Sequence, residues 1–241
     1  MPKNVPLDDN QIPNFYEHRD IQKHITQYHN PHFEETQMKI PFRCMIYAAS
    51  GGGKSNACLS ILAKMSDTFK HIFVCIPNGG QEPLYQFLQD KIGAKNITFF
   101  KKATEIPQMT KMPFTNEGQC CLIFDDMVNA PEVEQSVMRE WFLRGRKCGK
   151  GMSLFFLTQS YFKTQKFIRL NTNYLIILKM GSVRDLRLIL SDFNLGLKKE
   201  DLLAIYKDAT KEKFNFLKID AEADDDRKFS KNFTQFYEIE S

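Results

Sequence analysis

The chain reads Phe42-Arg43-Cys44-Met45-Ile46-Tyr47 and continues directly as Ala48-Ala49-Ser50-Gly51-Gly52-Gly53-Lys54-Ser55. An apolar strand that runs into a glycine-rich turn ending in Lys-Ser is the sequence pattern of a phosphate loop. The backbone N–H groups of such a loop turn inward around an anion, and the helix that follows directs its positive end at the same place. The pattern therefore predicts that this chain binds a nucleoside triphosphate.

Each residue of the loop has an expected role. We expect Lys54 to reach the β- and γ-phosphates of ATP and the Ser55 hydroxyl to ligate Mg²⁺. The residues expected to surround the phosphates are Ser50, Gly51, Gly52, Gly53, Lys54, Ser55 and Asn56. The usual pattern begins with Gly where Ala48 stands, a tolerable change because that position ends the strand. A glycine-rich surface turn is the alternative, but a helix-compatible stretch over 56–65 argues against it.

The composition is that of an ordinary globular protein, with 42% hydrophobic and 26% charged residues among 241. No apolar run approaches the roughly 20 residues of a membrane span, so we expect a protein of the cytoplasmic side. The six cysteines show no CxxC spacing, and four fall in predicted strands. Reduced, buried thiols are therefore expected rather than disulfides. The histidines of the first 37 residues match no metal-binding pattern and are read as surface residues.

Charge is distributed unevenly along the chain, although the net charge is only +4. From Arg139 to Arg187, eleven lysines and arginines face two acids, Glu140 and Asp185. From Asp220 onward, seven acids outnumber three bases. A basic region suits nucleic acid or phosphate, and an acidic tail suits mimicry of either or simple solubility. For any single basic residue, a solvated surface position is the competing interpretation.

Three regions are expected: an N-terminal arm over 1–37, a nucleotide-binding domain over 38–219 and an acidic tail over 220–241. In the domain, short apolar runs alternate with helical stretches, which indicates an α/β fold with a mainly parallel sheet and helices on both faces. The expected strands are 42–48, 70–76, 97–100, 120–124, 153–158 and 174–180, with a late edge strand at 214–219. The expected helices are 55–65, 82–91, 130–144, 183–191 and 198–208. The arm is read as extended with one short helix near 19–28, and the tail as frayed, with Phe233, Phe236 and Tyr237 free to dock on a neighbour.

Two acids follow the apolar run Cys120-Cys121-Leu122-Ile123-Phe124. At the carboxyl end of a central strand, Asp125 is expected to hold Mg²⁺ beside Ser55. Asp126 is placed to orient or deprotonate the attacking water. Its side chain is one methylene shorter than the Glu that many motor ATPases carry there, so another group could serve as base, and a purely structural role stays open.

Further polar residues close the next strand and the loop before it. Gln159 ends the apolar run 153–158 and is expected beside the phosphate loop, where it would bond the γ-phosphate or the attacking water; capping of the next helix is the alternative. Arg144 and Arg146 lie on a loop expected to face away from their own nucleotide. They would instead complete the site of a neighbouring subunit or contact DNA.

Four elements thus follow one another: the phosphate loop, the strand that ends in Asp125-Asp126, the arginine-bearing loop and the strand that ends before Gln159. In this order and spacing they resemble the FtsK–HerA superfamily of DNA-pumping ATPases. The stretch from Leu143 through Gln159-Ser160 resembles that superfamily's arginine-bearing loop and sensor strand, and the stretch from Tyr174 to Leu190 is similar to the segment that follows. Within the superfamily, the Asp125-Asp126 ending and Gln159-Ser160-Tyr161 resemble the poxvirus-type genome-packaging ATPases of large DNA viruses and virophages. The resemblance spans about 38–190, and Ala48 and Asp126 depart from the commoner pattern.

The resemblance implies a RecA-like P-loop NTPase core, ATP with Mg²⁺, a homo-oligomeric ring (pentamer or hexamer) and double-stranded DNA driven into a preformed capsid. It also implies a capsid or portal-vertex partner, and a viral assembly site in the host cytoplasm, or the virion itself, as the location. In this reading Lys54, Asp126, Gln159 and Arg146 carry catalysis.

The segment 161–166 combines bases with aromatics just past Gln159, so Lys163 and Lys166 are the expected DNA contacts. A surface helix start explains that segment equally well. The alternative function is a P-loop scaffold or switch in virion assembly that moves no DNA, although Asp126 and Gln159 favour hydrolysis. A small-molecule kinase would need an acceptor-binding lid, and no lid pattern stands out.

Overall fold

A computed structural model describes residues 14–180, 183–192, 197–224 and 226–238. Its centre is one sheet, with the described strands in the order β3-β2-β4-β5-β1-β6-β7-β8-β9. The strands from β3 to β6 pair in parallel, and β7, β8 and β9 continue the sheet antiparallel. The bounds are β1 Arg43–Tyr47, β2 His71–Cys75, β3 Ile97–Phe100, β4 Cys120–Asp125, β5 Met152–Thr158, β6 Tyr174–Ile177, β7 Leu217–Asp220, β8 Phe229–Lys231 and β9 Gln235–Phe236.

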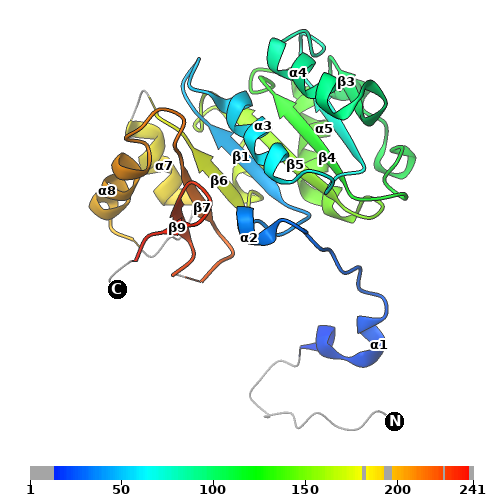
Figure 1. Cartoon of the computed structure of the whole chain (residues 1–241), viewed down its shortest axis with the longest axis horizontal. Coiled ribbons are helices and arrows are strands. Elements are labelled where there is room, and N and C mark those ends of the chain that lie inside the picture. Colours follow the sequence, from blue (N-terminus) through cyan, green and yellow to red (C-terminus); the bar gives the residue numbers. More distant parts are fainter. Residues whose placement is uncertain (1–13, 181–182, 193–196, 225, 239–241) are drawn as a thin grey trace.

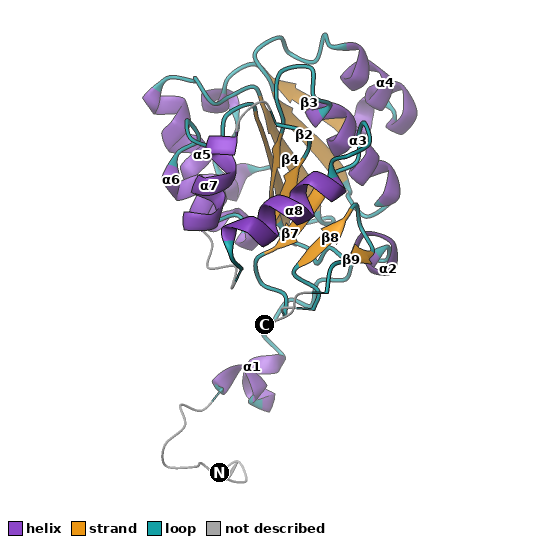
Figure 2. Cartoon of the chain, turned by 90° about the vertical axis from the view of Figure 1, so that its left-hand side faces the viewer, coloured by secondary structure: helices purple, strands orange, loops and turns teal. Residues whose placement is uncertain are grey.

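Helices cover both faces of the sheet (Figure 2). One core layer holds the apolar side chains of α3 and α4, and the other holds those of α5, α6, α7 and α8. The helix bounds are α1 Arg19–Gln22, α2 Phe33–Thr36, α3 Lys54–Lys64, α4 Pro83–Ile92, α5 Glu132–Arg144, α6 Lys166–Leu170, α7 Val183–Asp192 and α8 Lys199–Ala209. The predicted α/β class, with a mainly parallel sheet between two helical layers, is confirmed.

The central strands are buried along almost their whole length, which explains their continuous apolar sequences. Every residue of β2, β4, β5 and β6 is buried, because helices pack on both sides of them. All six predicted strands and all five predicted helices of the domain form, with ends shifted by a few residues. Helix α5, for example, begins at Glu132 rather than at 130, because Pro131 occupies its N-cap. All six cysteines are buried and free.

The expectation of a frayed tail was wrong. The predicted edge strand forms as β7, but it lies between β6 and β8, and the boundary at 219/220 therefore falls inside a strand. Beyond β7 the acidic sequence leads into β8, which pairs with β7. The aromatic side chains dock on their own chain: the Phe233 ring packs edge-on against Phe216 at 5.2 Å, and the Tyr237 hydroxyl donates to Asp208 at 2.6 Å. Apolar residues of this acidic region are buried and hold it on the body. The net charge alone gave no sign of that burial.

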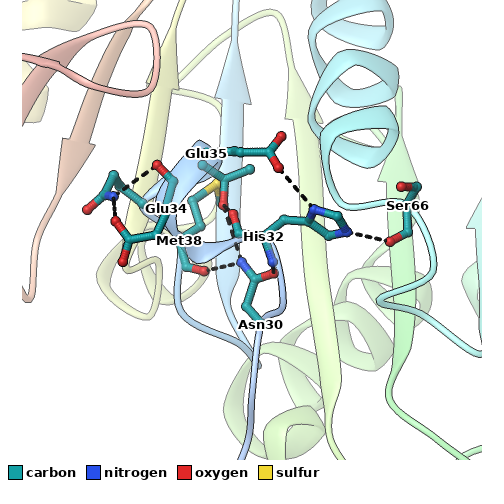
Figure 3. A network of polar contacts seen from close by, with 8 residues as sticks. Asn30, His32, Glu34, Glu35, Met38 and Ser66 are labelled. Carbon is teal, nitrogen blue, oxygen red and sulfur yellow. Dashed lines mark hydrogen bonds and ion pairs between the residues drawn. The ribbon is translucent and has the colours of Figure 1, made fainter.

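The N-terminal arm has two parts. Helix α1 projects away from the body (Figure 1), whereas the residues after it pack on the body and form α2. Figure 3 shows the junction: the buried side chain of Asn30 donates to the Met38 carbonyl oxygen at 2.7 Å, and His32 Nε2 lies 2.9 Å from the Ser66 carbonyl oxygen. The expected boundary at residue 37 is therefore too late for the packed body. None of the described helices is long and apolar enough to cross a membrane.

Candidate active site

The loop between β1 and α3 has the backbone that an anion cradle needs. Gly51 (φ +68°) and Gly53 (φ +91°) lie in the left-handed region that favours glycine. A β-carbon on Gly52 would lie only 2.8 Å from the Ala49 carbonyl oxygen. Gly53 is the N-cap of α3 and supplies no side-chain cap, so the first N–H groups of α3 face the loop. Ala48 is buried, and its N–H donates to the Thr158 carbonyl oxygen, so this position ends the strand as expected.

Ser55 and Asp125 meet beside this loop. The Ser55 hydroxyl donates to Asp125 Oδ2 at 3.0 Å, and the buried Tyr85 hydroxyl of α4 donates to the same oxygen at 2.7 Å. Burial raises the pKa of the Asp125 carboxyl, and the hydrogen bonds from Tyr85 and Ser55 and the charge of Lys54 oppose that rise. A hydroxyl and a carboxylate oxygen, side by side at the foot of the phosphate cradle, match the hard oxygen ligands that Mg²⁺ takes beside a nucleotide.

Asp126 and Gln159 form a second contact on the same edge of the sheet. Asp126 directly follows β4 with φ +57°, a conformation that Asp tolerates better than most residues, and its side chain is exposed. Gln159 directly follows β5, and its side-chain amide donates to Asp126 Oδ1 at 3.4 Å. Since β5 lies between β1 and β4, Gln159 stands between the phosphate loop and Asp126. The two polar groups therefore lie together on the edge of the sheet that carries the phosphate loop.

Two residues of this site were missed from the sequence. The sequence pattern predicts only that Tyr85 lies in the helix 82–91 and that Glu82 is the first residue of that helix. Burial raises the pKa of the Glu82 carboxyl, and the charges of Asp125 and Asp126 raise it further. The charge of Lys54 and a hydrogen bond with Asn78 oppose this rise. The available signal for Glu82 was its position. It comes after β2, the strand next to β4, and directly before Pro83, the first residue of α4.

The family model described as "Poxvirus A32 protein" matches residues 30–224, which is most of the chain. The chain belongs to the poxvirus A32 protein family. The match extends beyond the resemblance at 38–190 on both sides and takes in the packed part of the arm and the start of the tail. No curated protein matches the chain by sequence.

Solved structures similar to this A32-family chain include the genome packaging NTPase B204 of Sulfolobus turreted icosahedral virus 2. Its complex with AMP has a TM-score of 0.59 at 14% identity, covering 81% of this chain and 98% of that one. The B204 of Sulfolobus turreted icosahedral virus, described as a DNA-packaging ATPase, has a TM-score of 0.53 at 14% identity, covering 80% and 94%. The similar structures confirm the predicted P-loop NTPase fold, and the family match confirms the predicted resemblance to the poxvirus-type proteins.

The A32-family chain carries the two arginines at the other end of the sheet. Arg144 ends α5 and pairs with Glu140 at 2.9 Å, and Arg146 lies in the exposed 3-10 turn Gly145–Lys147 before β5 begins. The charge of Arg146 acts on Arg43 at the start of β1, whereas the phosphate loop follows the end of β1. Both arginines thus lie at the end of the sheet opposite the phosphate loop.

The segment after Gln159 lies on the same edge as the site but is only partly exposed. Lys163 and Lys166 are exposed, and so is Phe162, whose ring lies 4.8 Å from the Arg184 guanidinium. Tyr161, expected to be part of a DNA-contacting surface, is instead fully buried, and its hydroxyl donates to Asp192 at 3.1 Å. Tyr161 anchors the segment, and only the residues that follow it are available to a partner.

Proposed function

We propose that this chain is an ATP-hydrolysing translocase that packages viral double-stranded DNA into preformed capsids. The observation that supports this best is the paired contact at the sheet edge: Ser55 with Asp125, and Gln159 with Asp126. A protein that only binds a nucleotide needs the first pair. The second pair supports cleavage of the triphosphate, because it provides a carboxylate and an amide that act on the attacking water.

In this proposal each residue of the cradle has one task. The backbone of residues 50–56 and the ammonium group of Lys54 bind the phosphates, and Ser55 with Asp125 would hold Mg²⁺. When bound, Mg²⁺ neutralises charge on the β- and γ-phosphate oxygens. Tyr85 positions Asp125 by occupying one lone pair of Oδ2. Asp126 accepts the proton of the attacking water, and Gln159 orients that water.

In this proposal Gln159 also couples ATP hydrolysis to the movement of DNA. It bonds Asp126, and the chain continues directly from it through buried Tyr161 to the exposed lysines Lys163 and Lys166. A shift of Gln159 on loss of the γ-phosphate would therefore reach these lysines within a few residues. Ammonium groups that contact phosphates bind DNA without sequence preference, which suits a motor that must move any genome.

The partners in this proposal are double-stranded DNA, further copies of the chain in a pentameric or hexameric ring, and a capsid or portal-vertex protein. A ring is supported by the position of Arg146, which lies far from its own cradle on an exposed turn and so could act in the site of a neighbour. We further propose that the protein works at the viral assembly site in the host cytoplasm or within the virion.

An ATPase assay with and without duplex DNA, together with a mass measurement of the assembly, tests the proposal. We expect duplex DNA to stimulate hydrolysis by a multi-subunit assembly. A nucleotide-dependent scaffold or switch would instead hydrolyse ATP at a rate that duplex DNA does not change.

A further inference from the structure

The loop between α8 and β7 brings an aromatic side chain to the phosphate cradle. A β-carbon built on Gly53 would lie 3.0 and 3.2 Å from two carbons of the Phe214 ring. Gly53 is the residue immediately before Lys54, so the ring lies at the cradle itself. Phe214 is nevertheless 51% exposed. A large apolar ring is therefore held at the mouth of a binding site with about half of its surface in water.

The backbone of Phe214 is strained. Its φ is +69°, in the left-handed region that non-glycine residues other than Asn and Asp rarely adopt. Strain of this kind persists only where the surrounding structure holds it, and it clusters at ligand-binding sites. The neighbouring Asn215 supplies that hold: its side chain accepts a hydrogen bond of 3.2 Å from the Asn232 amide and donates one of 3.0 Å to Glu212. These bonds hold the loop on the C-terminal side of Phe214.

The strand order determines on which side of the cradle the nucleoside must lie. Asp126 and Gln159 follow β4 and β5, which lie on one side of β1. Since these residues face the γ-phosphate, the rest of the nucleotide extends toward the other side, where β6 and β7 lie. Phe214 precedes β7, and Leu178 after β6 also approaches Gly53. The exposed ring therefore stands on the nucleoside side of the cradle.

We infer that the Phe214 ring is the platform on which the nucleobase of the bound triphosphate stacks. This inference rests on the proposed nucleotide site and adds to it the residue that recognises the base. Stacking of a base on an aromatic ring is tolerant of base identity, because every base presents a π-face. The platform should therefore contribute to binding of ATP and of GTP alike and discriminate little between them.

A calorimetric titration of the full chain tests this inference with two ligands, a non-hydrolysable ATP analogue and inorganic tripolyphosphate, each with Mg²⁺. Removal of a stacking partner weakens binding by about 5- to 150-fold. Phe214→Ala should show a loss of that size for the ATP analogue and no loss for tripolyphosphate. The matched control is Phe87→Ala, a similarly exposed phenylalanine (55%) on α4, which should leave both affinities unchanged.

Phe214→Trp provides a second readout that does not depend on the Ala variant folding. Its added emission should be quenched by the ATP analogue and not by tripolyphosphate, and the affinity for the analogue should be retained. The inference is overturned if Phe214→Ala weakens both ligands equally, which would make the ring a support for the loop, or if it weakens neither. Equal quenching of Phe214→Trp by both ligands would also overturn it. Failure of the packaging proposal would appear separately, as an absent response to duplex DNA, which this titration does not contain.

Discussion

The hydroxyl of Ser55 donates a hydrogen bond to Oδ2 of Asp125 across 3.0 Å, although the two residues lie 70 positions apart. The contact exists because Ser55 lies in the first turn of α3, after the phosphate loop that follows β1, and Asp125 is the last residue of β4. Only β5 lies between these two strands. Parallel strands deliver their carboxyl ends to one edge, so residues that follow different strands converge there. Tyr85 completes the group from α4.

Tyr85 should tune magnesium binding without touching the nucleotide. Tyr85→Phe removes the 2.7 Å hydrogen bond to Asp125 and keeps the ring that fills the core. Loss of a partner that orients a metal ligand costs about 10- to 100-fold in metal affinity or activity. We therefore expect the Mg²⁺ concentration for half-maximal ATP hydrolysis to rise by that factor, while excess Mg²⁺ restores most of the rate. An unchanged Mg²⁺ dependence would show that Asp125 needs no such support.

The identity of the catalytic base can be decided by comparing two carboxylates. Asp126→Asn should lower kcat for ATP by about 10²- to 10⁴-fold, the range for loss of a general base, with nucleotide affinity nearly unchanged. Glu82→Gln should have a smaller effect, because Glu82 acts on the site through its charge. The measurement is steady-state hydrolysis combined with nucleotide binding for both variants. If Glu82→Gln proves as damaging as Asp126→Asn or worse, the base is Glu82 instead.

Arg146 should act in the active site of a neighbouring subunit. An arginine supplied in trans is worth about 10³- to 10⁵-fold in the rate of phosphoryl transfer, so Arg146→Ala alone should be nearly inactive. Mixing it with Lys54→Ala should restore hydrolysis, because the first subunit keeps an intact cradle and the second keeps Arg146. Arg139→Ala is the matched control, since this exposed arginine pairs with Glu132 within its own helix. A mixture that stays inactive would assign Arg146 to its own subunit or to DNA.

Lys218 should make stability depend on pH through its burial. Its side chain is 1% exposed, and its ammonium group donates to the carbonyl oxygens of Thr36, Gln37 and Phe233. Burial lowers the pKa of Lys218 to about 8. Between that value and about 10.4, the unfolded chain binds more protons at this site than the folded chain does. This lysine therefore contributes a rise in the free energy of unfolding as pH increases through that window, by roughly 3 kcal/mol at most.

Urea unfolding of the wild type and of Lys218→Met from pH 7.5 to 10.5 measures this contribution. Buried thiols and tyrosines also titrate in this window and act in the opposite direction, so the difference between the two proteins isolates Lys218. The wild type should gain stability relative to the variant as pH rises. A constant difference across the range would mean that the three carbonyl oxygens keep the ammonium group charged.

Much of the fold was readable from the sequence because its signals are local. Strands β1, β4 and β5 are largely apolar runs, and the glycines of the phosphate loop indicate the backbone conformation of that loop. Asp125, Asp126 and Gln159 each come just after the end of a predicted strand, and Ser55 comes at the end of the phosphate loop that continues another. The four could therefore be placed together. The same reasoning placed the arginines away from their own site, since a loop that precedes β5 lies at the opposite edge.

The features that escaped prediction depend on contacts between distant segments. In the sequence, Tyr85 is one aromatic residue of a predicted helix. Its contact with Asp125 arises because the pairing of β2 with β4 brings α4 over Asp125. Strands β8 and β9 span three and two residues, too few for a periodic pattern, and the acids before them suggested fraying. Phe214 carried no signal at all, because only the fold brings the loop after α8 to Gly53.

Displacement of a third strand from duplex DNA measures the central claim most directly. A triplex-forming oligonucleotide is bound to a long linear duplex, and its release is followed after addition of the protein with ATP and Mg²⁺. A translocase predicts ATP-dependent release, with Lys54→Ala releasing no more than the reaction without ATP. Vigorous ATP hydrolysis without any release from the duplex would contradict the account and assign the chain to nucleotide-dependent assembly without DNA movement.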